Sequence, residues 1–67
     1  MPTPTGLPKA GETWAYRGQP FTVIQRTRGE YWSLRIRWTP PLPGHPVEDW
    51  LVDAPWYAAR GELAYLP

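Results

Sequence analysis

The chain has 67 residues, ten of them proline, and carries a formal net charge of +1 with no cysteine. These values predict one small domain near the lower size limit for independent folding, and they exclude disulfide bonds and cysteine-based metal sites. Five Trp, four Tyr and one Phe must supply most of the buried surface, and the small net charge alone argues neither for nor against nucleic acid.

The first nine residues, MPTPTGLPK, contain three prolines and no apolar run. This composition predicts an irregular N-terminal arm over residues 1–9 and no secretory signal. Residues 10–67 are expected to form a single domain. No stretch has the length and apolar character needed to cross a bilayer, so we expect a cytoplasmic protein without membrane contact.

Three short strands are expected after the arm, in GETWAYRG (11–18), PFTVIQRT (20–27) and YWSLRIRW (31–38). Side chains on a strand alternate between its faces, and the third segment alternates without a fault. A tight turn is expected at 27–30, so that the strands form an antiparallel meander. Trp14 and Tyr16 are expected to share one face of the first strand, and Phe21 and Val23 one face of the second. The side chains of the third strand that are expected to face inward are Trp32, Leu34, Ile36 and Trp38.

The segment TPPLPGHP at 39–46 has four prolines in eight residues. It predicts a loop with polyproline character, because proline is excluded from central strands and helix interiors. Extended structure resumes at 47–52. Asp53 then stands at an N-cap position before one or two helical or 3₁₀ turns, which Gly61 can end. The tail at 62–66 predicts a final edge strand.

This order of strands, long loop and late helical turn resembles a Src-homology-3-like small barrel of the kind found in short bacterial or phage proteins. The segments that carry the resemblance are GETWAYRG, VIQRTRGEYW and DAPWYAARGEL, and it covers about residues 10–66. It implies an all-β barrel of about five short antiparallel strands. A closed barrel has no free sheet edge, which suits a chain with few other defences against aggregation.

The sequence gives little support for catalysis or metal binding. Ser33 and His45 are the only serine and the only histidine, and their spacing with Asp49 does not favour a nucleophile–base–acid arrangement. His45 with Glu48 and Asp49 is a weak set of metal ligands, and no glycine-rich phosphate loop is present. We therefore expect a non-enzymatic domain with no cofactor, no metal and no small-molecule substrate.

The charges are distributed unevenly, which points to a binding surface. Residues 1–38 hold six basic and two acidic side chains (+4), whereas residues 39–67 hold one basic and four acidic side chains (−3). Arginine forks bind phosphate and an exposed ring can stack on a base, so the first three strands are expected to present a nucleic-acid-binding face. Its expected residues are Arg17, Arg26, Arg28, Tyr31, Arg35 and Arg37. Alternatively, these arginines pair with the acidic second half of the same chain.

A protein partner is the alternative function, for which two features are candidates. Arg37, Pro40 and Pro43 match the spacing Arg-x-x-Pro-x-x-Pro that proline-binding domains recognise, although a stiff connecting loop has the same composition. The aromatic side chains that could line a groove or anchor an interface are Trp14, Tyr16, Trp50, Trp56 and Tyr57. The alternative is therefore a small interaction module, such as a phage-type inhibitor or adaptor, that docks through Pro40, Pro43, Trp50, Trp56 and Tyr57.

Overall fold

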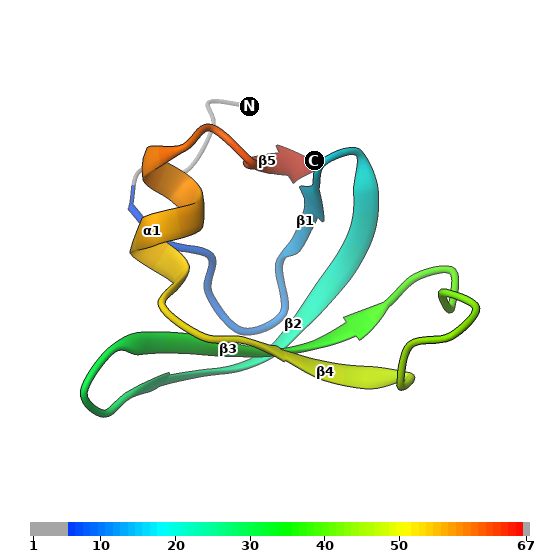
Figure 1. Ribbon diagram of the computed structural model, residues 1–67, viewed down its shortest axis with the longest axis horizontal. Coiled ribbons are helices and arrows are strands. Elements are labelled where there is room, and N and C mark those ends of the chain that lie inside the picture. Colours follow the sequence, from blue (N-terminus) through cyan, green and yellow to red (C-terminus); the bar gives the residue numbers. More distant parts are fainter. Residues whose placement is uncertain (1–5, 67) are drawn as a thin grey trace.

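The computed structural model describes residues 6–66, which form one five-stranded antiparallel sheet and one short helix (Figure 1). The strand order in the sheet is β4-β3-β2-β1-β5. This confirms the prediction of about five short antiparallel strands with one helical turn near the C-terminus. The elements are β1 (Thr13–Tyr16), β2 (Gln19–Arg28), β3 (Trp32–Trp38), β4 (Glu48–Leu51), α1 (Ala54–Ala59) and β5 (Leu63–Leu66).

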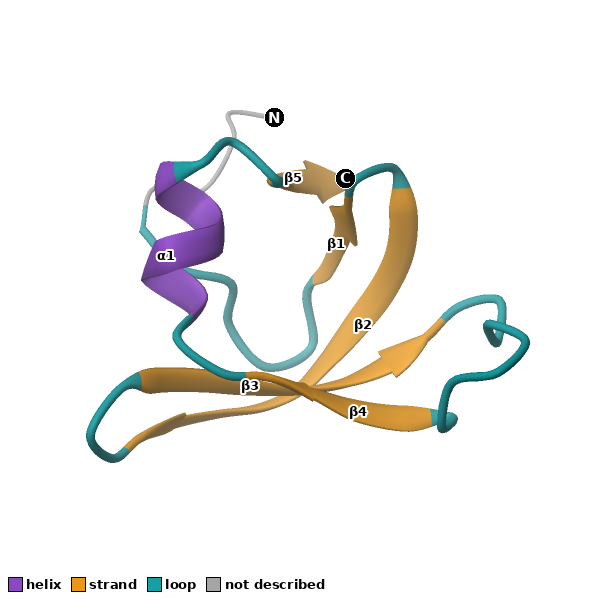
Figure 2. Cartoon of the chain, in the orientation of Figure 1, coloured by secondary structure: helices purple, strands orange, loops and turns teal. Residues whose placement is uncertain are grey.

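The sheet is not closed, so the predicted barrel is not confirmed. Strands β4 and β5 are its two edges, and in the part of the chain that the structure describes no ladder joins them. The ten-residue β2 bends through both halves of the sheet, pairing with β1 at its start and with β3 over most of its length (Figure 2). Helix α1 lies over β3, between β5 and the β3–β4 half (Figure 1).

The hydrophobic core lies between the two halves of the bent sheet and α1. Alternation along β3 buries Leu34, Ile36 and Trp38 as predicted, but Trp32 is only half-buried. Each fully buried large apolar side chain contributes about 1.5–3 kcal/mol relative to an exposed one. The core cluster consists of Trp14, Phe21, Val23, Leu34, Ile36, Trp38, Leu51 and Ala54.

Strands β1 and β2 are joined by a two-residue turn at Arg17 and Gly18. Both residues have positive φ, 49° and 86°, and Tyr16 pairs with Gln19 across the turn. Positive φ at both central residues is the geometry that matches the twist of an antiparallel hairpin. The second hairpin turns later than predicted, because β2 extends to Arg28 before the chain reverses.

The helix begins and ends as the sequence suggests, except at its N-cap. Asp53 precedes α1, but its backbone is left-handed (φ 63°) and its side chain makes no capping hydrogen bond. At the other end, Gly61 has φ 73° and its N–H donates to the Ala58 carbonyl over 3.0 Å. No helix within residues 6–66 is both long enough and apolar enough to cross a membrane.

The two proline-rich segments also contact the fold. Residues 1–5 of the predicted arm lie outside the described residues, whereas Leu7 packs against the core and Pro8 is buried. In the loop between β3 and β4, Leu42 packs against the core and the Thr39-Pro40 peptide bond is cis.

Candidate functional site

A β-bulge in β2 divides the predicted arginine surface between the two faces of the sheet. The pairing of β2 with β3 shifts at Ile24, which adds one residue to β2. Because alternation has a period of two, this extra residue moves Arg26 and Arg28 to the face that also bears the core. Arg26 consequently lies directly opposite Leu34, a fully buried core residue. The predicted convergence of five arginines on one exposed face therefore does not occur.

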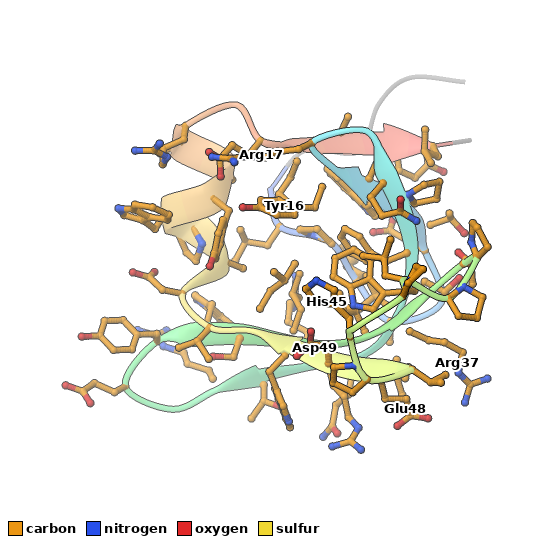
Figure 3. The ribbon with its side chains drawn as sticks, turned by 45° about the vertical axis from the view of Figure 1, so that its right-hand side comes forward. Tyr16, Arg17, Arg37, His45, Glu48 and Asp49 are labelled. Carbon is orange, nitrogen blue, oxygen red and sulfur yellow. The ribbon has the colours of Figure 1, made fainter. Side chains whose placement is uncertain are left out.

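The outer face of the sheet carries Arg35, Arg37, Glu48 and Trp50. Figure 3 shows Arg37 and Glu48 on the side of the sheet away from α1. Arg37 Nη2 donates to Glu48 Oε2 over 2.8 Å, while Arg35 Nε and Nη2 donate to Oε1 over 3.1 and 3.0 Å. Hydrogen bonds from Arg37 and then Arg35 lower the pKa of the Glu48 carboxyl. The Arg35 guanidinium also lies 5.4 Å from the centroid of the Trp50 ring. Both predicted phosphate contacts on this face are thus engaged by the protein itself.

Arg17 is also held by a carboxylate. Its Nη2 lies 2.7 Å from Glu62 Oε1, and Arg60 Nε lies 3.2 Å from the same oxygen. The Glu62 side chain is only 10% exposed, and the hydrogen bond from Arg17 lowers the pKa of its carboxyl although burial opposes this. Arg17 therefore joins the β1–β2 turn to the segment between α1 and β5, and this contact explains the residue without a ligand.

Two arginines remain, Arg26 and Arg28. They lie against the ring of Trp32 in the β2–β3 hairpin, and the exposed Tyr31 precedes Trp32 in the sequence. We call Arg26, Arg28, Tyr31 and Trp32 the hairpin cluster. The guanidinium carbons of Arg26 and Arg28 lie 5.0 and 5.3 Å from the centroid of the Trp32 ring, within the range of cation–π attraction. Within residues 6–66, no carboxylate oxygen lies within 4.0 Å of either guanidinium. Arg26 Nη1 makes one polar contact, a hydrogen bond of 3.4 Å to the Leu7 carbonyl.

The hairpin cluster lies where the hairpin extends beyond its neighbours. Strand β4 runs along β3 only as far as Leu34, so the chain from Arg28 to Trp32 projects past it (Figure 1). Tyr31 is 50% exposed and Arg28 is exposed as well. The alternation along β3 predicts that Trp32 faces the core. That Trp32 belongs to the hairpin cluster follows only from its pairing with Arg28 in the structure.

The aromatic residues of the alternative prediction do not form a groove. No pocket is found in the described part of the chain, and Trp14 is buried in the core. Tyr57 is half-buried and makes an edge contact with Trp56, their ring centroids 5.0 Å apart. Trp50 and Trp56 are the two exposed indoles, 46% and 51% accessible, and they belong to β4 and α1.

The residues of the proline motif lie in β3 and in the loop that follows it. Arg37 belongs to β3 and contacts Glu48, whereas Pro40 and Pro43 are exposed in the loop that Leu42 anchors to the core. The segment connects β3 to β4.

Asp49 lies on the core-facing side of β4 and contacts three neighbouring residues. Its Oδ2 lies 3.9 Å from His45 Nδ1 and accepts a hydrogen bond of 3.5 Å from the Trp38 indole, and its Oδ1 accepts one of 2.8 Å from the Trp50 amide (Figure 3). Ser33 lies elsewhere, opposite Thr27 in the β2–β3 hairpin. Among the residues that the structure describes, no three metal-ligating side chains come together.

No protein-family model, no curated protein and no solved structure matches the chain.

Proposed function

We propose that this chain is a non-catalytic module that binds nucleic acid through the hairpin cluster. One observation carries the proposal: Arg26 and Arg28 have no carboxylate partner among the described residues, whereas Glu48 and Glu62 engage the other four arginines. A guanidinium without a carboxylate partner can bind a phosphate without first breaking an ion pair.

The contact with Trp32 favours phosphate binding further. A long arginine side chain loses rotamer freedom when it binds a ligand, and the cation–π contact with the indole restricts Arg26 and Arg28 before binding. Trp32 is thus a positioning residue, and Arg28, the more exposed arginine, is the main expected phosphate contact.

The small number of unpaired arginines sets the strength of the interaction. With two phosphates neutralised, the logarithm of the binding constant should fall with the logarithm of salt concentration with a slope of about −1.4 for a single strand and −1.8 for a duplex. The binding is consequently expected to be weak and sensitive to salt. Two arginines neutralise fewer phosphates than four or five converging arginines would have done.

Binding can be measured by fluorescence anisotropy, using labelled DNA and RNA between about 50 and 200 mM salt. Arg28→Gln should weaken binding and make the salt slope shallower by about one phosphate. Arg37→Gln is the matched control, because it removes the same charge from the same sheet at a residue that contacts Glu48. Failure to bind either nucleic acid at the lowest salt, or an equal loss in both variants, would contradict the proposal.

A protein partner is the second candidate function, supported by the two exposed indoles, Trp50 and Trp56. Large aromatic side chains with about half of their surface exposed are typical anchors of protein interfaces. A stoichiometric complex that tolerates high salt and is lost in Trp50→Ala would favour this candidate over nucleic acid.

A further proposal concerns the fold, which we relate to the Src-homology-3-like small barrels. The support is the order of the elements, with four strands, a long loop after the third, a helical turn and a final strand. The open sheet leaves the closure of such a barrel incomplete.

A further inference from the structure

We infer that the hairpin cluster binds single-stranded rather than double-stranded nucleic acid. This inference rests on the proposed function and adds the class of ligand. Three observations carry it: an exposed aromatic ring in the same hairpin as the two arginines, the direction in which those arginines are held, and the charge of the surfaces around them.

The aromatic ring is Tyr31, which follows the turn of the projecting hairpin and is 50% exposed. An exposed ring next to phosphate-binding groups contributes to binding when it can stack on the face of a base. In a duplex each base face is already covered by its neighbours, so Tyr31 would gain little. In a single strand the base faces are accessible, and one base can stack on Tyr31 while the adjoining phosphates contact Arg28 and Arg26.

The arginines are directed unfavourably for a duplex. A two-stranded β-ribbon can enter the major groove, but its reading side chains must then project freely from the ribbon. Arg26 and Arg28 instead occupy the face of the hairpin that continues into the core, and both lie against Trp32. Arg26 is half-buried and also donates to the Leu7 carbonyl. A ligand that contacts these two arginines must therefore approach near the end of the hairpin, on its core-facing side, which suits a flexible strand better than a rigid helix.

The charge around the cluster is also too low for a duplex footprint. A duplex presents phosphates from both strands, and proteins that bind it usually neutralise many of them. On the outer face, Arg35 and Arg37 share the carboxylate of Glu48. Glu30 adds a negative, exposed side chain within the hairpin turn itself. A ligand that needs only two phosphate contacts and one stacked base fits this surface.

The test compares three labelled probes of about 12 nucleotides, a length that small nucleic-acid-binding barrels span: oligo-dT, oligo-U and a blunt DNA duplex. Binding is measured at low salt by anisotropy for the whole chain and for three variants. Tyr31→Ala removes the ring, Tyr31→Phe is its matched control that keeps the ring, and Arg28→Gln removes the phosphate contact. Tyr31 is exposed, so neither substitution at this position is expected to disturb folding.

We expect the single strands to bind about tenfold more tightly than the duplex. Tyr31→Ala should lose about tenfold on the single strands, within the range for one stacked base, and less than about twofold on the duplex, whereas Tyr31→Phe should bind like the unchanged protein. Ring-dependent binding of either homopolymer supports the inference, and their relative affinities assign the ligand to DNA or RNA. Equal binding of single strand and duplex that depends on Arg28 but not on Tyr31 overturns it and leaves the proposed function standing. Absence of binding to all three probes overturns both.

Discussion

Arg17 Nη2 lies 2.7 Å from Glu62 Oε1, a contact between residues that are 45 positions apart in the sequence. It joins the turn of the first hairpin to the segment that leads from α1 into β5. Arg60 donates to the same oxygen, so one nearly buried carboxylate holds two guanidiniums. Because β5 is an edge strand that pairs with β1 alone among the described strands, this ion pair helps to fix the C-terminal part of the sheet.

The contribution of Glu62 to stability should depend on pH. The arginines lower the pKa of this carboxyl in the folded protein below the ordinary value of 4.5. The stabilisation is therefore fully present above the unfolded-state pKa and is lost as the pH falls through the folded-state value. We expect Glu62→Gln to lower the melting temperature at pH 7. The difference in melting temperature between this variant and the unchanged protein should become smaller as the pH falls. Thermal melts followed by circular dichroism between pH 7 and pH 3 measure this difference.

The control for that experiment is Glu30→Gln, since Glu30 makes no ion pair within residues 6–66. Its melting temperature should follow that of the unchanged protein at every pH. A difference between Glu62→Gln and the unchanged protein that stays constant across the pH range would show that the ion pair does not contribute through its charge.

Stability should be sensitive to single methyl groups in the core. Ile36 is fully buried in β3, and Ile36→Val is expected to cost about 0.5–1.5 kcal/mol. A domain of this length has a free energy of unfolding of about 3–10 kcal/mol, so Leu34→Ala, at about 2–5 kcal/mol, should leave a substantial unfolded population. Urea unfolding measures the free energy of unfolding of each variant, and Val52→Ala on the exposed surface is the control. If Val52→Ala lowered the free energy of unfolding as much as Ile36→Val, this assignment of the core would be contradicted.

Asp49 should contribute through its hydrogen bonds to Trp38 and Trp50. Asp49→Ala removes the acceptor for both N–H groups, and each lost bond is expected to cost about 0.5–1.5 kcal/mol. Asp49→Asn keeps an amide oxygen and should recover part of the loss, which denaturant unfolding of the two variants can measure. Equal stability of Asp49→Ala and the unchanged protein would exclude this role.

The alternation of apolar and polar residues was sufficient to predict most strands and the inward side chains Leu34, Ile36 and Trp38. Local signals also located the helical turn before Gly61. These features depend on neighbours in the sequence, where a period of two or a glycine with positive φ has a direct local meaning. The N-cap hydrogen bond expected from Asp53 does not form, because the residue adopts a left-handed backbone in the sharp turn out of β4.

The arrangement of the arginines could not be predicted in the same way. The bulge at Ile24 reverses the faces of Arg26 and Arg28, and nothing in the composition of β2 indicates a register shift. The pairing of Arg35 and Arg37 with Glu48 depends on the register between β3 and β4, which a proline-rich loop separates in the sequence. Whether the sheet closes depends on the relative positions of its edge strands β4 and β5, which no local sequence pattern indicates.

The hairpin cluster contains one residue that should oppose its function, and this gives the last prediction. Glu30 lies in the turn between Arg28 and Tyr31, and its negative charge should repel a phosphate bound there. Glu30→Gln is expected to raise the affinity for single-stranded nucleic acid by roughly two- to fivefold at low salt. The gain should shrink by about 200 mM salt, because the charge is exposed and screened. Glu30→Asp keeps the charge and should bind like the unchanged protein. An affinity of Glu30→Gln at or below that of Glu30→Asp at low salt would place the bound phosphates away from the hairpin turn.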